Sequence, residues 1–184
     1  MHLSELTGNL LLAMPSLEDT NFFDSVVLLC HHDAEGSMGL IINRPQNISV
    51  SAVLDDMHLE GIKKPEQPTF EGGPVEPFRG FVLHDSWQVY DSTLCVTPEI
   101  HLTTSRDVLE EIARGDGPEH FMLLLGYAGW EAGQLEEEIN RNDWLISPAN
   151  AQLVFHTPIE QRWIVGAQAM GVNKAQLSTQ VGHA

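Results

Sequence analysis

The 184-residue sequence predicts an α+β fold, a single domain in which about four helices surround a curved, mostly antiparallel mixed sheet. Two observations lead to this fold class. Segments typical of strands come first along the chain, and helices alternate with strands only later, without the regular repeat of a doubly wound sheet. Several segments are apolar on both faces, as in central strands covered on each side. The domain is predicted to span 1–184, with a loosely held polar tail at 172–184.

The predicted strands are short apolar or β-branched segments bordered by turn-forming residues. They are Asn9–Ala13, Ser25–His32, Met38–Asn43, Pro68–Glu71, Gly80–His84, Leu94–Thr97, Phe121–Leu125, Trp144–Ile146 and Leu153–Phe155. The polar segment Gly61–Pro68 contains two prolines and is expected to be a surface loop.

Apolar spacing and capping residues predict the helices. Residues at i, i+3, i+4 and i+7 make Ser49–Met57 a short amphipathic helix. A second helix is expected between a Thr104 cap and a terminating Gly115. Its core-facing residues would be Val108, Leu109 and Ile112. A third is expected to begin near Gly129, and its inner stripe would be Ala132, Leu135 and Ile139.

The fourth predicted helix has the strongest local signal. Thr157–Glu160 matches a capping box with Pro158 at the first helical position, and Gly171 would end the helix. The inward-facing residues would be Trp163, Ala167 and Met170.

Charge argues against direct nucleic-acid binding. The chain has 26 acidic and 9 basic residues, which gives a formal net charge of −17. Affinity for duplex DNA rests on Lys and Arg side chains that neutralise phosphates, and here they are scattered, with Lys63–Lys64 as the only adjacent pair. The same charge disfavours anionic membrane surfaces.

A cytoplasmic protein without membrane association is expected. Apolar runs such as Val26–Cys30 are too short to span a bilayer, and the first residues lack the basic start of a signal peptide. Cys30 and Cys95 each lie in an apolar run and no C-x-x-C is present, which predicts two reduced core thiols.

The sequence predicts no catalytic residue, no metal site and no cofactor. His31 and His32 are adjacent, so their side chains diverge, unlike paired zinc ligands. His84, Asp85 and Ser86 are the residue types of a catalytic triad, but neighbours on a strand point to opposite faces. His84 alone is expected to be a hydrogen-bonded structural histidine.

The glycine-rich stretch FMLLLGYAGWEAGQLEEEI suggests a strand, a glycine corner and a helix, an arrangement that can hold phosphate. Gly126, Gly129 and Gly133 match no phosphate-binding fingerprint, and no lysine lies between Lys64 and Lys174. A structural corner is therefore favoured over an anion or ligand site.

The three consecutive glutamates that follow, Glu136–Glu138, predict a solvated helix face and not a catalytic group of carboxylates. Glu137 is expected to point to solvent and pair with Arg141 one turn later, and Glu136 and Glu138 are expected to flank the apolar stripe.

Two further segments leave alternatives open. Gly72-Gly73-Pro74 predicts either a hairpin-like link to the strand ending at His84 or a pocket wall whose amides meet a ligand. Arg44 is held extended by the following Pro45 and could pair with a buried carboxylate or receive an anionic ligand.

Several segments together are similar to the AlgH/YqgE family of bacterial proteins. They are GNLLLAMPSL, FFDSVVLLCHHD, GSMGLIINRP, FEGGPVEP, RGFVLHD, LLLGYAGWEAGQLEEEI, NDWL and the C-terminal LS…VGHA. The resemblance implies one α+β domain whose bifurcated sheet partly closes into a small barrel. It implies no catalytic residue, and one branch of the family is labelled as transcriptional regulators.

The motif positions and Arg44 give the candidate ligand-binding residues. They are Arg44, Gly72, Gly73, Pro74, His84, Gly126, Tyr127, Gly129, Trp130 and Gln134. Glu137 also matches the family pattern.

The first functional hypothesis is a non-enzymatic binding or regulatory module with a protein or small-molecule partner. The alternative is a small-molecule or nucleotide-binding enzyme with a pocket between the GGPV and GYAGW turns. A transcriptional regulator that binds DNA directly ranks third because of the net charge of −17.

Overall fold

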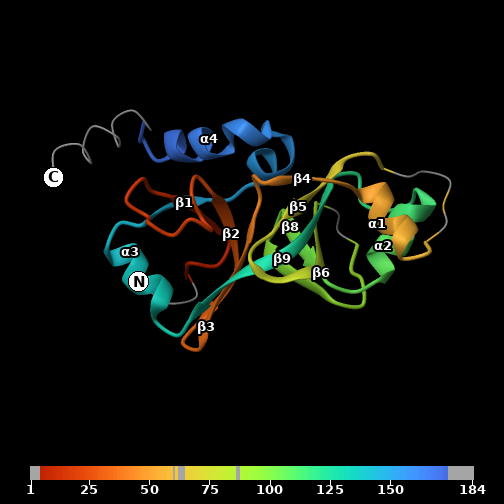
Figure 1. Cartoon of the computed structure of the whole chain (residues 1–184), viewed down its shortest axis with the longest axis horizontal. Coiled ribbons are helices and arrows are strands. Elements are labelled where there is room, and N and C mark those ends of the chain that lie inside the picture. The colour runs from red at the N-terminus through yellow and green to blue at the C-terminus, as the bar shows by residue number, and fades with distance from the viewer. Residues whose placement is uncertain (1–4, 60, 62–64, 86–87, 174–184) are drawn as a thin grey trace.

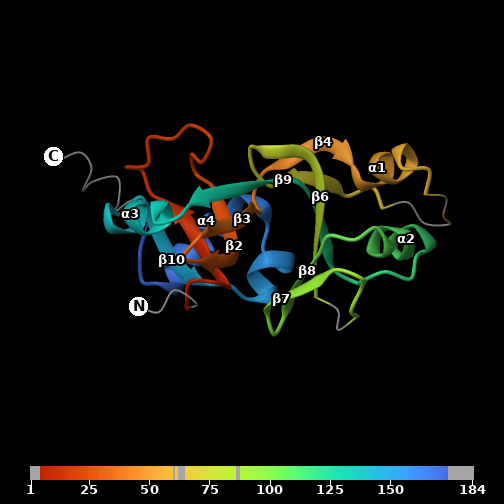
Figure 2. The same cartoon turned by 90° about the horizontal axis from the view of Figure 1, so that it is seen from below.

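The computed structural model describes residues 5–59, 61, 65–85 and 88–173, which form one domain around a curled sheet (Figures 1 and 2). The main path of the sheet runs β10–β1–β2–β3–β9–β6–β8–β7. The strands are β1 (Asn9–Ala13), β2 (Val26–Asp33), β3 (Gly36–Ile41), β4 (Pro45–Ser49), β5 (Pro68–Glu71), β6 (Val75–His84), β7 (Thr93–Thr97), β8 (Ile100–Thr103), β9 (Phe121–Glu131) and β10 (Trp144–Pro148).

The sheet forks at β9, which runs diagonally across the molecule in Figure 1. One edge of β9 pairs with β6, and the other pairs with β5 near Leu124 and with β3 near Ala128. The β5–β9 pair is parallel, whereas the other pairs are antiparallel. The predicted curved, mixed and mostly antiparallel sheet is therefore confirmed.

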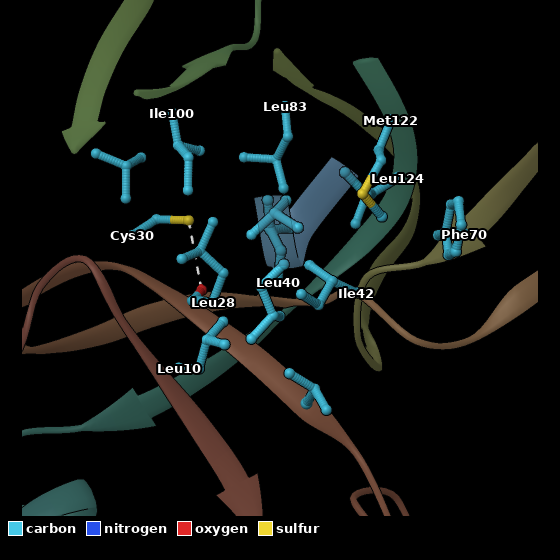
Figure 3. Packing of buried hydrophobic residues seen from close by; sticks show 14 of the residues in the cluster. Leu10, Leu28, Cys30, Leu40, Ile42, Phe70, Leu83, Ile100, Met122 and Leu124 are labelled. Carbon is cyan, nitrogen blue, oxygen red and sulfur yellow. Dashed lines mark hydrogen bonds between the residues drawn. The ribbon is translucent and has the colours of Figure 1, made fainter. Parts of the chain in front are cut away.

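The two arms of the fork share one apolar core. Leu10 and Leu28 from β1 and β2 point toward Leu83 and Ile100 from β6 and β8, as Figure 3 shows. All four side chains are fully buried. Burial of this apolar surface is the main favourable contribution to the stability of the curled sheet.

The strands β1 and β2 are apolar on both faces because both faces are covered. Alternate residues such as Leu11 and Val27 point away from the shared core and pack with Leu135 of α3. On the opposite face, Trp163 and Ala167 of α4 close the shared core.

Helices lie at both ends of the molecule. α1 (Val50–Asp56) and α2 (Asp107–Arg114) pack on β6 and β9 at one end, and α3 (Gln134–Asn140) and α4 (Arg162–Ala169) lie toward the other (Figure 1). The described residues also include a π-helical turn (Gln152–His156) and a 3₁₀ turn (Ile159–Gln161). No helix within the described ranges is long and apolar enough to cross a membrane.

The first two helices match their predictions except for one cap. The Ser49 hydroxyl accepts a hydrogen bond from the Ala52 amide, 3.1 Å away, at the start of α1. Gly115 ends α2 in the left-handed conformation. Thr104 does not cap α2, because its hydroxyl bonds to that of Ser92 at 2.8 Å and the helix begins three residues later.

Three predictions near the fourth helix are wrong. Leu153–Phe155 is part of the π-helical turn, since a short apolar run fits a buried helical turn as well as a strand. The capping box does not form: the Thr157 hydroxyl donates to the Gln152 carbonyl at 3.2 Å, and α4 begins only at Arg162. Met170 is also 46% exposed instead of facing inward.

The two cysteines differ in environment. Both are free, and Cys30 is buried as predicted. Cys95 is exposed, so the prediction of a second core thiol is wrong. It lies on the edge strand β7, where its apolar neighbour Leu94 is also exposed.

Residues 174–184 of the predicted tail lie outside the described ranges, as do Lys63, Lys64 and Ser86.

Candidate functional site

The GYAGW segment continues β9 and does not turn into a helix. Gly129 pairs with Met38 of β3, and this ladder keeps the chain extended as far as Glu131. The helix begins at Gln134, after Gly133 with a φ of 78°. The predicted strand–corner–helix at Gly129 is therefore wrong, and the exposed Ala132 is not part of the helix's inner stripe.

The two glycine segments meet backbone to backbone. A Cβ atom at Gly72 would lie 2.3 Å from the Gly126 carbonyl oxygen, and one at Gly73 would lie 2.1 Å from the Tyr127 carbonyl carbon. A Cβ atom at Gly126 would lie 2.4 Å from the Gly73 oxygen. The pocket predicted between the two turns is therefore filled by their own backbones.

The close contact has a topological reason. β5 and β6 pair with opposite edges of β9, so Gly72–Pro74 carries the chain across that strand. The predicted hairpin-like link between β5 and β6 is wrong, because both strands pair with β9. Glycine permits this crossing, since a side chain on either segment would separate the two backbones.

Arg44 and His84 both have hydrogen-bond partners within the protein. The Arg44 guanidinium donates to the carbonyls of Asn21 and Phe23 and so anchors the loop before β2. His84 is fully buried, with its Nε2 atom 2.7 Å from the Thr103 hydroxyl. The predicted hydrogen-bonded structural histidine is confirmed.

Trp130 and Gln134 contact Glu138 of α3. The indole nitrogens of Trp130 and Trp144 donate to one Glu138 carboxylate oxygen, at 2.7 and 3.1 Å. The Gln134 amide lies 3.4 Å from the other oxygen. The sequence reasoning missed Glu138, although tryptophans in apolar segments generally need an acceptor for their N–H groups.

A second glutamate of the acidic run also faces the sheet. The Glu136 carboxylate lies 2.9 Å from Nε2 of the buried His32. Only Glu137 is exposed, and Arg141 pairs with Asp143 at 3.1 Å instead. The predicted exposure of Glu137 and the position of Glu136 and Glu138 beside the apolar stripe are therefore confirmed, whereas the predicted Glu137–Arg141 pair is wrong.

His32 also contacts a serine, so three residue types of a catalytic triad meet here. The Ser37 hydroxyl lies within hydrogen-bond distance of His32 Nδ1, opposite the Glu136 contact. Both Ser37 and His32 are buried beneath α3. We interpret these three side chains as polar groups that hold α3 on the sheet, because a catalytic nucleophile must be accessible to its substrate.

A groove of about 630 Å³, here called the α1–α2 groove, lies between the two helices and the sheet. Val82 and Leu123 of β6 and β9 form its floor, and Ala52 and Val53 of α1 line one wall. Volumes of 300–1,000 Å³ and mainly apolar walls are typical of ligand sites.

The mouth of the groove exposes large apolar side chains. Phe78 is 94% exposed and Ile48 is 45% exposed. The polar groups of the lining include Asp56, Thr103 and Arg106. Arg106 donates to the carbonyl of Met57 at 3.0 Å, which ties α2 to the end of α1.

Among the candidate residues, His84 reaches the groove indirectly. Its partner Thr103 lines the groove, and the Thr103 hydroxyl also lies 2.8 Å from the hydroxyl of the half-buried Thr93. Tyr127 lines a different cavity and packs edge-on against Phe81, with ring centroids 5.9 Å apart. The structure therefore does not gather the candidates into one site.

No group of three or more His, Cys, Asp or Glu side chains within the described ranges could hold a metal ion.

Comparison with known proteins shows the family to which the chain is similar. The AlgH-like family model matches residues 10–175. A UPF0301 protein of Ralstonia nicotianae is 49% identical over 181 residues, covering 97% of this chain and 95% of its own. A UPF0301 protein of Thioalkalivibrio sulfidiphilus is 46% identical and covers 98% of each chain.

Two solved structures share the fold. The AlgH protein of Pseudomonas aeruginosa has a TM-score of 0.79 and 43% identity, covering 97% of this chain and 96% of that one. A protein of Corynebacterium diphtheriae has a TM-score of 0.72 at 22% identity, covering 89% and 86%, which supports the fold alone. Together with the family model, these matches confirm the resemblance inferred from the sequence motifs. The chain belongs to the AlgH-like family.

Proposed function

We propose that the chain is a non-enzymatic binding module whose α1–α2 groove receives an apolar segment of a partner protein. The observation that supports this function best is Phe78, which is 94% exposed at the mouth of an apolar groove. Exposed aromatic residues beside apolar pockets are typical of the anchors that dominate protein interfaces.

A protein partner fits this surface better than an enclosed small molecule. The apolar surface continues from the groove floor at Val82 out to Phe78 and Ile48 on the rim. A ligand seated only in the groove would leave the rim in water, whereas a partner segment would cover floor and rim together. The free thiols of Cys30 and Cys95 support a cytoplasmic location, which we also propose.

Photo-crosslinking in cells tests the proposal. A benzoyl-phenylalanine at position 78 should give discrete adducts with a partner. One at Val89, which is also highly exposed at 82%, is the positional control. Ala52→Trp fills the groove from an exposed helix position, and Ala132→Trp is the matched control away from it. Adducts that require residue 78 and disappear only with Ala52→Trp would support the proposal. Equal adducts at 78 and 89, or none, would contradict it.

The small-molecule alternative is favoured by one observation, the groove volume of about 630 Å³. Thermal-shift measurements with nucleotides, flavins and phosphorylated metabolites test it. Stabilisation that Ala52→Trp removes and Ala132→Trp retains would favour this alternative over the protein partner.

A further inference from the structure

Arg162 is a buried cation at the start of α4. The residue is only 5% exposed. Nε donates to the Thr157 carbonyl at 3.1 Å, and Nη1 donates to the Ile42 carbonyl. The guanidinium carbon lies 5.7 Å from the centre of the Phe70 ring. These contacts fix the orientation of the guanidinium and satisfy Nε and Nη1.

The positive charge of Arg162 has no carboxylate in contact. No Asp or Glu within the described ranges forms an ion pair with it, and Nη2 donates to none of the residues described. Burial lowers the pKa of Arg162 to about 10, and the charge of Glu160 partly opposes this change. The guanidinium thus stays protonated at neutral pH, and a buried charge without a counter-charge is costly.

Arg162 lines a cavity of about 220 Å³. His120 stands on the same wall, with its Nδ1 atom 2.6 Å from the Asp85 carboxylate. That contact orients the ring, the His156 ring packs edge-on against it with centroids 4.4 Å apart, and Nε2 has no hydrogen-bond partner among the described residues. Gln67 is an exposed member of the lining. Glu119, the carboxylate of the lining, is exposed to solvent.

We propose that this cavity binds a small oxyanion, a phosphate or carboxylate group, through Arg162 Nη2 with His120 as a second donor. Guanidinium groups bind such anions by charge-assisted hydrogen bonds, and the cavity is too small for a drug-sized ligand. The site is separate from the α1–α2 groove and does not depend on the function proposed for that groove.

Thermal unfolding in sodium phosphate, sodium acetate and sodium chloride at equal ionic strength tests the site. We expect phosphate or acetate, at about ten times its dissociation constant, to raise Tm by about 3 °C relative to chloride. Gln67→Glu places a carboxylate on the cavity wall and should abolish this shift. Gln67→Met removes the same amide without adding charge and should retain the shift. Gln168→Glu, an exposed position on α4, makes the same change in net charge elsewhere and should also retain it.

The side-chain 15N–1H signal of Arg162 gives a direct readout. Titration with phosphate or acetate should shift this signal in the wild type and in Gln67→Met, but not in Gln67→Glu. Arg162→Met should lose the response if it folds, and the Gln67 pair decides the question if it does not. An absent Tm shift in the wild type, or an equal shift in Gln67→Glu, would overturn the proposal.

Discussion

At the scale of single residues, the glycines of this chain differ in what they do. Gly126 and Gly133 both have a positive φ, 79° and 78°. Gly126 lies against the backbone that crosses β9, whereas a Cβ atom at Gly133 would meet nothing within 4 Å. At position 126, both packing and backbone conformation require glycine. At position 133, backbone conformation alone requires it.

Replacing these two glycines separates the two requirements. Gly133→Ala should lower the free energy of unfolding by about 1 kcal/mol, the usual cost of a left-handed alanine. Gly126→Ala should lower it by about 3 kcal/mol, because its Cβ atom also displaces the Gly73 carbonyl. Urea denaturation of both variants measures the difference, and equal losses would contradict the tight crossing.

Cys30 gives stability a dependence on alkaline pH. Burial raises the pKa of this thiol from 9.0 to about 12. Below pH 9 the thiol is protonated in both states. Above pH 9 the unfolded chain loses the proton first, so this group should lower the free energy of unfolding by about 1.4 kcal/mol per pH unit up to pH 12.

A variant without the thiol isolates this contribution. Cys30→Ala leaves a small cavity and should be about 1 kcal/mol less stable than the wild type at pH 7. The difference should shrink and then reverse between pH 9 and pH 12, in urea titrations under reducing conditions. Parallel pH profiles for the two proteins would show that Cys30 does not titrate as described.

At the scale of elements, α3 shows how buried polar contacts attach a short helix to a sheet. The helix has 7 residues, and Leu135 is its one buried apolar side chain. Glu138 joins it to Trp130 of β9 and Trp144 of β10, so one carboxylate connects three elements. Helices this short have little stability of their own, and such contacts should decide whether α3 stays in place.

We expect Glu138→Ala to lower the free energy of unfolding by about 3 kcal/mol, because two buried indole N–H groups lose a charged acceptor. Glu137→Ala, one residue away and exposed, should change it by less than about 0.5 kcal/mol. Tryptophan fluorescence during urea unfolding follows both variants. Similar values for the two would argue that the indole contacts contribute little to the stability of the fold.

At the scale of the whole molecule, the net charge of −17 limits the choice of partners. Acidic side chains repel the phosphate backbone of DNA, so we expect the chain not to bind DNA directly.

The measurement is fluorescence anisotropy with a labelled duplex. We expect no saturable binding below about 10 μM protein at 50 mM KCl, because few basic side chains can release counterions. Binding that weakens steeply as the salt concentration increases would reveal a basic surface. It would support the hypothesis of a regulator that binds DNA directly.

The sequence by itself determined the fold class, most strands, the family and the identity of the buried apolar segments. These follow from periodicities and motifs that act over a few residues, such as the two-sided apolar pattern of Leu10–Leu12 and the spacing within Ser49–Met57. Gly115 was likewise recognised as a helix terminator, because its effect on the backbone is local.

The tertiary structure decided which distant segments meet. Gly72 and Gly126 are far apart in the sequence, and only the crossing of β9 shows that their backbones touch instead of enclosing a pocket. The groove beside Phe78 and the cavity beside Arg162 are likewise assembled from strands and helices of different regions. Local patterns carry no information on such contacts, because chain topology brings these residues together.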